Sequence, residues 1–129
     1  MLPLTASLVT KAEMALATAE REMAVQERPN HGAVCLHSER CAERYLKARL
    51  VEAGIAFPES TRHLVVLLQL CLDLDPEWEL YRHHLRTLTT RGFQVDDPQT
   101  IMGRDAAREC LDLGLEFRAA VRSRLGLPS

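Results

Sequence analysis

Residues Cys35 to Ala48 read CLHSERCAERYLKA, and this stretch decides the fold class. Four of its residues follow one another at intervals of 4, 4 and 3; they are His37, Cys41, Tyr45 and Ala48. Such intervals put side chains on one face of an α-helix, which turns once every ~3.6 residues. The stretch therefore predicts a helix, which we extend from about Gly32 to Ala53.

Six prolines divide the rest of the chain; they are Pro3, Pro29, Pro58, Pro76, Pro98 and Pro128. Proline lacks the N–H that a helix interior needs, so each of the five segments between them is expected to hold one helix. The first segment carries a helical apolar stripe of Leu8, Ala12, Ala15, Ala19 and Met23. The last segment carries a similar stripe of Met102, Ala106, Cys110, Leu113, Phe117 and Val121. No segment shows the period of two that is typical of a strand.

These segments predict a single all-α domain over residues 1–129, an antiparallel bundle of four long helices plus one shorter helix. The third helix, from about Thr61 to Leu74, is apolar nearly all round, so we expect it to be the most buried. The fourth helix begins at Asp75-Pro76, where a capping residue precedes a proline, and runs to about Arg91.

The charge balance restricts the class of function. Sixteen basic and eighteen acidic side chains give a net charge of -2, which argues against a generally basic nucleic-acid coat protein. Aromatic residues are only 5% of the chain, too few for a platform that stacks several bases. The longest apolar run, around Leu64 to Leu72, is too short to span a bilayer, and the start of the chain lacks the pattern of a signal peptide. We therefore expect a cytoplasmic location.

The cysteine and histidine spacing does not match a metal site. Cys35, Cys41, Cys71 and Cys110 form no CxxC pair, and we expect them to be buried free thiols. His83 and His84 are adjacent, so their rings point about 100° apart on a helix and cannot hold one ion together. We predict neither a metal nor a cofactor.

Two groups of residues on the second helix are candidate contact surfaces. The first group is charged and consists of Glu39, Arg40, Glu43, Arg44 and Lys47. It can be a solvated face of mutually paired charges, or a binding face for RNA, a nucleotide or a partner protein. The second group, His37, Cys41 and Tyr45, is a candidate dimer interface. A histidine in this position can equally be a hydrogen-bonded core residue.

The fourth helix supplies the remaining candidates, which are Arg82, His83, His84, Arg86 and Arg91. Arg82 and Arg86 are one turn apart, so two guanidiniums are expected to project together as a ridge that fits phosphate oxygens. The alternative is an ordinary solvated polar face. Arg82, His83, His84 and Arg91, together with His37, are the only plausible catalytic groups in the chain.

The sequence resembles the HEPN (higher eukaryote and prokaryote nucleotide-binding) family over about residues 8 to 122. The stretch from Cys35 to Ala48 is similar to a family helix that reads C-F-H-A-Q-Q-A-A-E-K-A-L-K-A. Gly54-Ile55-Ala56-Phe57-Pro58 matches the G-I-x-F-P turn that follows in such members. Thr61-Arg62-His63-Leu64 matches in part their T-H-D-L opening of the next helix.

The resemblance implies an all-α bundle that pairs as a homodimer and acts on or near RNA or nucleotides. Many members are metal-independent ribonuclease toxins, often encoded beside a minimal nucleotidyltransferase that serves as antitoxin. Catalytic members carry an arginine that is followed, after four to six residues, by a histidine, and no arginine of this chain is followed by a histidine at that spacing. Small members read V-R-Y-P before the last helix, whereas this chain reads Val95-Asp96-Asp97-Pro98.

The sequence therefore favours a non-catalytic HEPN-like dimer that binds a nucleotide, RNA or a nucleotidyltransferase-like partner, as in a toxin–antitoxin system. The likeliest contact surface in this interpretation is the second helix from Glu39 to Lys47. One alternative is a metal-independent ribonuclease with a rearranged site. The other is a purely structural helical adaptor.

Overall fold

The computed structural model describes residues 1–129 and contains only helices and connecting loops. The elements, in chain order, are α1 (Pro3–Met23), α2 (His31–Glu52), α3 (Leu64–Cys71), η1 (Pro76–Tyr81), α4 (Arg82–Gln94) and α5 (Arg104–Arg124). The element η1 is a single stretch of 3₁₀ helix. The predicted all-α fold class is confirmed. None of the helices combines the length and the apolar character that crossing a bilayer requires.

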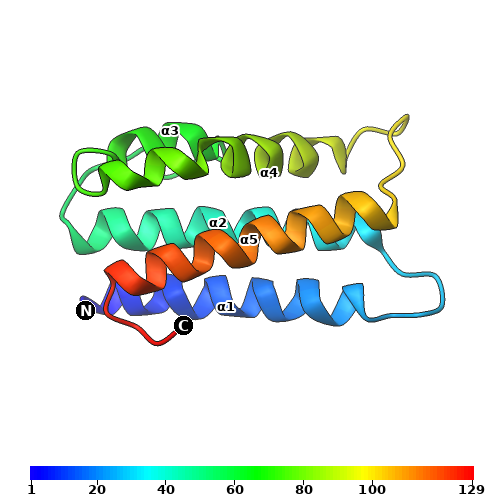
Figure 1. Ribbon diagram of the computed structural model, residues 1–129, viewed down its shortest axis with the longest axis horizontal. Helices are drawn as coiled ribbons and strands as arrows, with labels where there is room; N and C mark the ends of the chain where they lie inside the picture. Colours follow the sequence, from blue (N-terminus) through cyan, green and yellow to red (C-terminus); the bar gives the residue numbers. More distant parts are fainter.

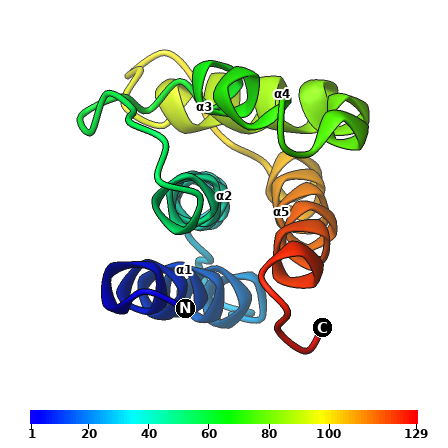
Figure 2. The ribbon, with the colours of Figure 1, turned by 90° about the vertical axis from the view of Figure 1, so that its left-hand side faces the viewer.

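The helices are arranged around α2. Figure 1 shows α2 running back along α1, and α5 running back along α4. Viewed from the end of the bundle, α1 lies on one side of α2, α3 and α4 lie on the opposite side, and α5 lies on a third side (Figure 2). The fourth side of α2 has no helix beside it (Figure 2). This arrangement decides which residues of α2 are buried.

The sequence predicted the wrong central helix. The helix expected from Thr61 to Leu74 spans only Leu64–Cys71 and lies in an outer layer beside α4. Val66 in this helix is 47% exposed, because only one side of α3 packs on the rest of the chain. The central position belongs to α2, whose composition is far more polar. In this bundle the short apolar helix α3 covers one side, whereas the longer helix α2 has other helices on three of its sides.

The fourth predicted helix is divided. Its start at Pro76 is confirmed, but residues 76–81 form the 3₁₀ helix η1 before α4 begins at Arg82. The 3₁₀ segment turns Trp78 inward, where its ring meets the Phe117 ring edge-on at 5.4 Å between centroids. Asp75, which is fully buried, accepts a hydrogen bond from Arg49 Nε at 2.8 Å and so joins the start of η1 to α2.

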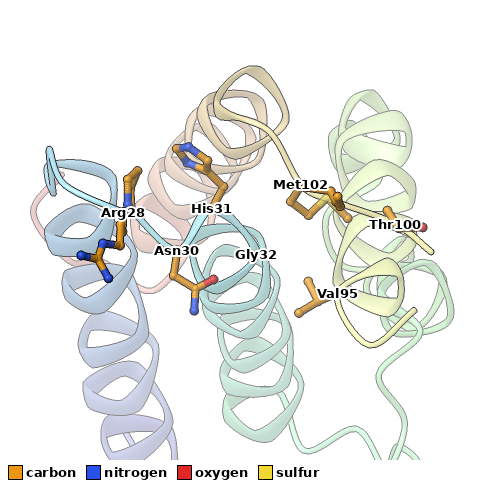
Figure 3. Close-up of a pocket in the computed structure, with 9 residues that line it drawn as sticks. Arg28, Asn30, His31, Gly32, Val95, Thr100 and Met102 are labelled. Atoms are coloured by element: carbon orange, nitrogen blue, oxygen red, sulfur yellow. The ribbon is translucent and has the colours of Figure 1, made fainter. Parts of the chain in front are cut away.

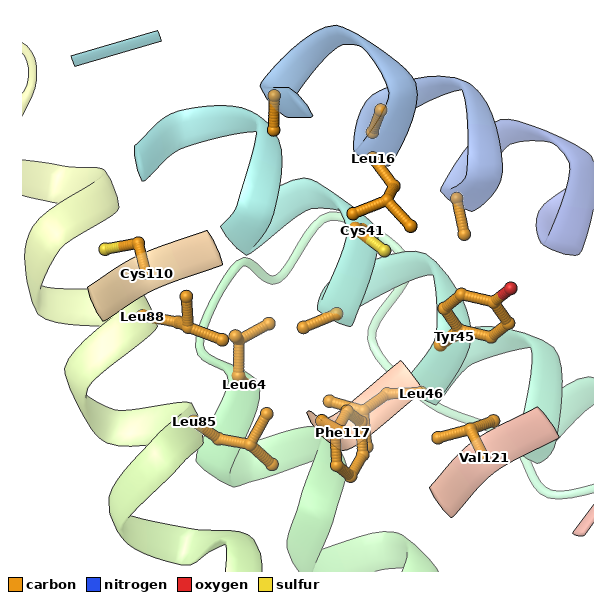
Figure 4. Packing of buried hydrophobic residues seen from close by; sticks show 14 of the residues in the cluster. Leu16, Cys41, Tyr45, Leu46, Leu64, Leu85, Leu88, Cys110, Phe117 and Val121 are labelled. Carbon is orange, nitrogen blue, oxygen red and sulfur yellow. The ribbon is translucent and has the colours of Figure 1, made fainter. Parts of the chain in front are cut away.

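The apolar stripes of the first and last helices are confirmed as parts of one core. Ala12, Ala15 and Ala19 of α1 are buried against α2, and their small side chains permit the close approach of the two helices. Phe117 and Val121 of α5 are fully buried, and Figure 4 shows them beside Leu46 and Tyr45 of α2. All four cysteines are buried free thiols, as predicted.

A polar connection ties three helices together at one end of the core. The Tyr45 hydroxyl of α2 donates to Glu13 Oε2 of α1 at 2.5 Å. Arg118 of α5 donates to both oxygens of the Glu13 carboxylate at 2.8 Å, and Arg122 Nη1 donates to the Tyr45 oxygen at 3.1 Å. Burial of the ring, together with the Glu13 carboxylate, raises the pKa of Tyr45 to about 12. The phenol therefore stays neutral and keeps both hydrogen bonds at physiological pH.

We expect Tyr45→Phe to lower the free energy of unfolding by about 1–2 kcal/mol, since two hydrogen bonds to charged side chains are lost inside the bundle. Urea denaturation followed by circular dichroism at 222 nm measures this change. Tyr81→Phe is the matched control, because Tyr81 packs its ring on Phe117 without a hydrogen bond from its hydroxyl. Equal stability of Tyr45→Phe and the parent protein would show that the connection contributes nothing.

Two helical glycines differ in the space around them. A Cβ at Gly92 of α4 would lie 3.1 Å from Glu39 Cγ and 3.2 Å from its Cδ, while Glu39 is fully buried and cannot move aside. A Cβ at Gly114 of α5 would meet Ser38 at 3.5 Å, which is an ordinary contact. Gly92 therefore sets the close approach of α4 to α2.

We expect Gly92→Ala to destabilise the protein by about 1 kcal/mol, since overpacking outweighs the gain in helix propensity. Gly114→Ala is the control and is expected to be neutral or to stabilise by up to ~1 kcal/mol through propensity alone. Thermal unfolding of the two variants side by side measures the difference. Two variants with equal melting temperatures would contradict the tight contact at Gly92.

Candidate functional site

The charged group predicted on α2 is not a continuous surface. Glu39 is fully buried, and Glu43 and Lys47 are 8% and 9% exposed. Lys47 Nζ donates to Glu43 Oε2 at 3.0 Å and to the Glu59 carbonyl at 2.7 Å, so it fastens the loop after α2. Within the chain α4 and the loop after α2 cover these three residues, so the binding face predicted from Glu39 to Lys47 stays a prediction for its accessible members alone. Arg40 and Arg44 alone are half-exposed.

Glu39 lies at the junction of α2, α4 and the loop before α3. Its Oε2 accepts a hydrogen bond from Arg62 Nη2 at 3.3 Å and lies 3.6 Å from Arg40 Nε, while Oε1 has no partner. Burial raises the pKa of this carboxyl, and Arg62 opposes that shift. The Arg62 guanidinium in turn lies 5.1 Å from the centroid of the Phe93 ring. No surface pocket opens onto Glu39, so its part is to hold the helices together.

The predicted dimer interface also needs correction. Cys41 and Tyr45 have no exposed area within one chain. The face that they share with His37 turns toward α1 and α5 at those two positions, and Figure 4 shows Cys41 beside Leu16 of α1. A second copy of the chain cannot cover side chains that the chain itself encloses. Only His37 of this group is half-exposed.

His37 lies on the side of α2 that has no neighbouring helix, near Arg40 and Arg44. Burial lowers the pKa of this imidazole below its ordinary value of 6.5, and the two arginines lower it further. The imidazole of His37 is therefore neutral at physiological pH, and the two arginines lie near it. Its environment is therefore positively charged and lacks a carboxylate partner.

Two of the candidates on α4 are already paired. Arg82 donates to the Glu79 carboxylate at 2.6 and 2.8 Å and to Gln69 Oε1 at 3.0 Å. His84 Nε2 lies 2.5 Å from Glu116 Oε2 of α5, and its ring meets Tyr81 edge-on. Arg82 therefore does not form the expected ridge with Arg86, since Glu79 and Gln69 hold its guanidinium.

The other α4 candidates lie together on the outer face of the helix. His83, Arg86, Thr87, Thr90 and Arg91 line a surface pocket of about 380 Å³, which we call the α4 pocket. Positions 83, 86 and 87, 90 and 91 recur at helical spacing, so the helix itself brings these side chains to one face. No carboxylate lines the pocket. The sequence singled out His83, Arg86 and Arg91, but the two threonines were missed.

A second pocket adjoins the first and shares Arg86 and Thr90 with it. It measures about 220 Å³ and adds His63, Leu64, Val65 and Thr89 from the start of α3 and from α4. Thr89 Oγ1 accepts a hydrogen bond from the Leu64 N–H at 3.3 Å, which positions the start of α3 against α4. Arg86 and Thr90 therefore border both pockets, of which the second is partly apolar.

The largest of these pockets was not predicted and lies where the start of α2 meets the end of α4 and the loop before α5. It measures about 480 Å³ and is lined by Arg28, Pro29, Asn30, His31, Gly32, Val95, Thr100, Ile101 and Met102. Figure 3 shows that the side chains of Arg28, His31 and Thr100 point in different directions. Asn30 Oδ1 is used to cap α2 through the Ala33 N–H at 2.9 Å. These polar groups do not converge on one ligand.

The bundle and its cationic outer helix define an all-α module with one surface suited to anions. The family model of the HEPN domain matches residues 5–124, which is nearly the whole chain. The chain therefore belongs to the HEPN family, as the residues from Cys35 to Ala48 led us to expect. HEPN domains are generally related to nucleotides or RNA, and they often dimerise. Comparisons with curated proteins and with solved structures gave no match.

The environment of His37 gives a prediction for its titration. We expect an NMR titration of the His37 ring protons to give a pKa below 6.5, and Arg44→Ala to raise it by removing one of the nearby cations. As pH falls below about 6.5, the imidazole of His37 binds a proton more readily in the unfolded chain than in the folded chain. The free energy of unfolding is therefore expected to decrease over this range of pH. Arg86→Ala, on α4, is the control. A pKa of 6.5 or higher would contradict the charge environment described above.

Proposed function

We propose that this protein is a non-catalytic HEPN module that binds a phosphate group of a nucleotide or RNA in the α4 pocket. The composition of α4 carries the proposal. Its thirteen residues, RHHLRTLTTRGFQ, contain three arginines and two histidines and no acidic residue. Glu79 and Glu116 pair with Arg82 and His84, so Arg86 is the arginine of α4 that forms no ion pair within the chain.

The pocket residues have the chemistry that phosphate requires. Arg86 is exposed and forms no hydrogen bond or ion pair within the chain. Arg91 has only distant partners, with Glu109 Oε1 at 3.8 Å and Gln94 Oε1 at 3.5 Å. A guanidinium matches two phosphate oxygens at once, and threonine hydroxyls donate to a third. Thr87 and Thr90 lie in the same pocket and supply such hydroxyls.

The missing ribonuclease motif supports binding without cleavage. Metal-independent cleavage needs a proton acceptor and a cation at the same phosphate, which the family's arginine–histidine pair supplies. In the loop before α5, Asp96 and Asp97 stand where related members carry an arginine and a tyrosine, and Asp97 accepts from the Gln99 N–H at 3.0 Å and from Thr100 Oγ1 at 2.8 Å. These two hydrogen bonds lower the pKa of Asp97, so an ionised carboxylate would repel a phosphate there.

Dimerisation and a protein partner belong to the same proposal. A homodimer and a nucleotidyltransferase-like partner, as in a toxin–antitoxin system, are suggested by the family to which the chain belongs. Any such interface must use residues other than Cys41 and Tyr45, which are enclosed. His37, Arg40 and Arg44 are the members of the predicted α2 surfaces that stay accessible.

A ribonuclease with a rearranged site is the second candidate, because His83 and Arg86 share one pocket. Their order along the chain is the reverse of the family motif, and they are only three residues apart. Purified protein incubated with labelled single-stranded RNA distinguishes the two functions. Cleavage that disappears in His83→Ala would contradict the non-catalytic proposal.

We expect Arg86→Ala to weaken binding of labelled single-stranded RNA or ATP about five- to tenfold, and Arg86→Ala with Arg91→Ala to weaken it further. Fluorescence anisotropy at several salt concentrations measures the affinity, and the dependence on salt should become shallower in each variant. Arg108→Ala is the matched control, since Arg108 is an exposed arginine on α5 that is paired with Asp112. Unchanged affinity in the double variant would rule out the α4 pocket.

A further inference from the structure

The outward side of α2 carries two arginines, Arg40 and Arg44, whose charge the rest of the chain neutralises only in part. The residues of this side that are partly exposed are Ala33, Leu36, His37, Arg40, Arg44 and Val51, and we call them the α2 outer stripe. Figure 2 shows that no helix lies beside α2 on the side away from α5. Arg49 is also partly exposed but is bound to Asp75. The stripe is separate from the α4 pocket.

In the middle of α2 two acidic and two basic residues differ in burial, although Lys47 is also buried and Glu52 is partly exposed. Glu39 and Glu43 are buried, whereas Arg40 and Arg44 are not. Arg44 forms no hydrogen bond or ion pair, and Arg40 has only Glu39 Oε2 at 3.6 Å, an oxygen that already accepts from Arg62. Two like charges one helical turn apart repel each other, so this pair does not serve stability. An acceptor from outside the chain would remove the repulsion.

We infer that the α2 outer stripe docks an acidic amphipathic helix of another protein. Arg40 and Arg44 are four residues apart, about 6 Å along the axis, which matches two carboxylates four residues apart on a facing helix. Leu36 and Val51 lie on either side of the two arginines along the stripe and offer apolar area for leucines that flank those carboxylates. A mixture of arginine and apolar side chains is typical of protein interfaces.

The composition of the stripe favours a protein over a nucleic acid. Half of its members are apolar, namely Ala33, Leu36 and Val51, and the stripe contributes no hydroxyl donor. The α4 pocket, by contrast, is lined only by polar side chains and includes two threonines. A phosphate chain would gain little from the apolar members, whereas an amphipathic helix buries them.

A second copy of this chain fits the stripe less well. Its exposed acidic residues on α5 are Asp105, Glu109, Asp112 and Glu116. Arg108 pairs with Asp112 at 2.7 Å and His84 with Glu116 at 2.5 Å, so much of this charge is already used. A different protein with unpaired carboxylates therefore fits the stripe better than α5 of a second copy does.

The test uses the full chain and a synthetic 18-residue amphipathic helix with two glutamates four residues apart, flanked by leucines. We expect the peptide to bind, and Arg44→Glu to weaken its binding about tenfold; the double variant Arg40→Glu with Arg44→Glu should weaken it more. Arg44→Glu is the key variant, because Arg44 has no partner whose loss would disturb the fold. Arg86→Glu, in the α4 pocket, is the matched control and should leave peptide binding unchanged.

Several results would overturn the inference. A peptide with glutamine in place of glutamate, or a scrambled peptide of the same charge, should bind at least tenfold more weakly; equal binding of either contradicts a specific acidic helix. An undetectable affinity for the glutamate peptide contradicts it directly. Loss of RNA binding in Arg44→Glu, with peptide binding intact, would assign the stripe to nucleic acid. A dimer of the chain alone that Arg44→Glu dissociates would assign it to a second copy.

Discussion

The enclosure of a polar helix is the constraint on which this structure depends. Helices lie against α2 on three sides, yet α2 carries Glu39, Glu43 and Lys47 among its buried residues. A buried charge is costly unless it is paired, so each of these side chains needs a partner from α2 itself or from another element. Arg62 and the Glu59 carbonyl come from the loop after α2. The packing of the loop and of α4 follows from that requirement.

The pairing of charges within the chain also determines which charged side chains remain available for binding. Carboxylates of α1, α2 and η1 are used inside the chain, as in the pairing of Glu13 with Arg118 and of Glu79 with Arg82. The arginines that form no ion pair within the chain include Arg86 on α4 and Arg44 on the outward side of α2. A net charge of -2 hides this distribution, because the total says nothing about where the unpaired cations lie.

The sequence predicted the helices well and the site only in part. Prolines, glycines and apolar stripes locate helices because they act within a few residues of each other along the chain. Whether Glu39 or Tyr45 faces inward depends on partners such as Arg62 and Glu13, which lie 23 and 32 residues away. Periodicity of α2 cannot reveal this, since polar residues occur all round it. His83 and Arg91 could be found because one helix alone brings them together.

The four buried cysteine thiols can be used to detect when the helices of the bundle separate. Two cysteines lie on α2, one on α3 and one on α5, and none has exposed area. Burial raises the pKa of Cys41 and of Cys71 to about 12, so the reactive thiolate is scarce in the closed bundle. An alkylating reagent can modify each sulfur only after the surrounding helices separate. The order in which the four sites are labelled thus records which helix detaches first, without any added probe.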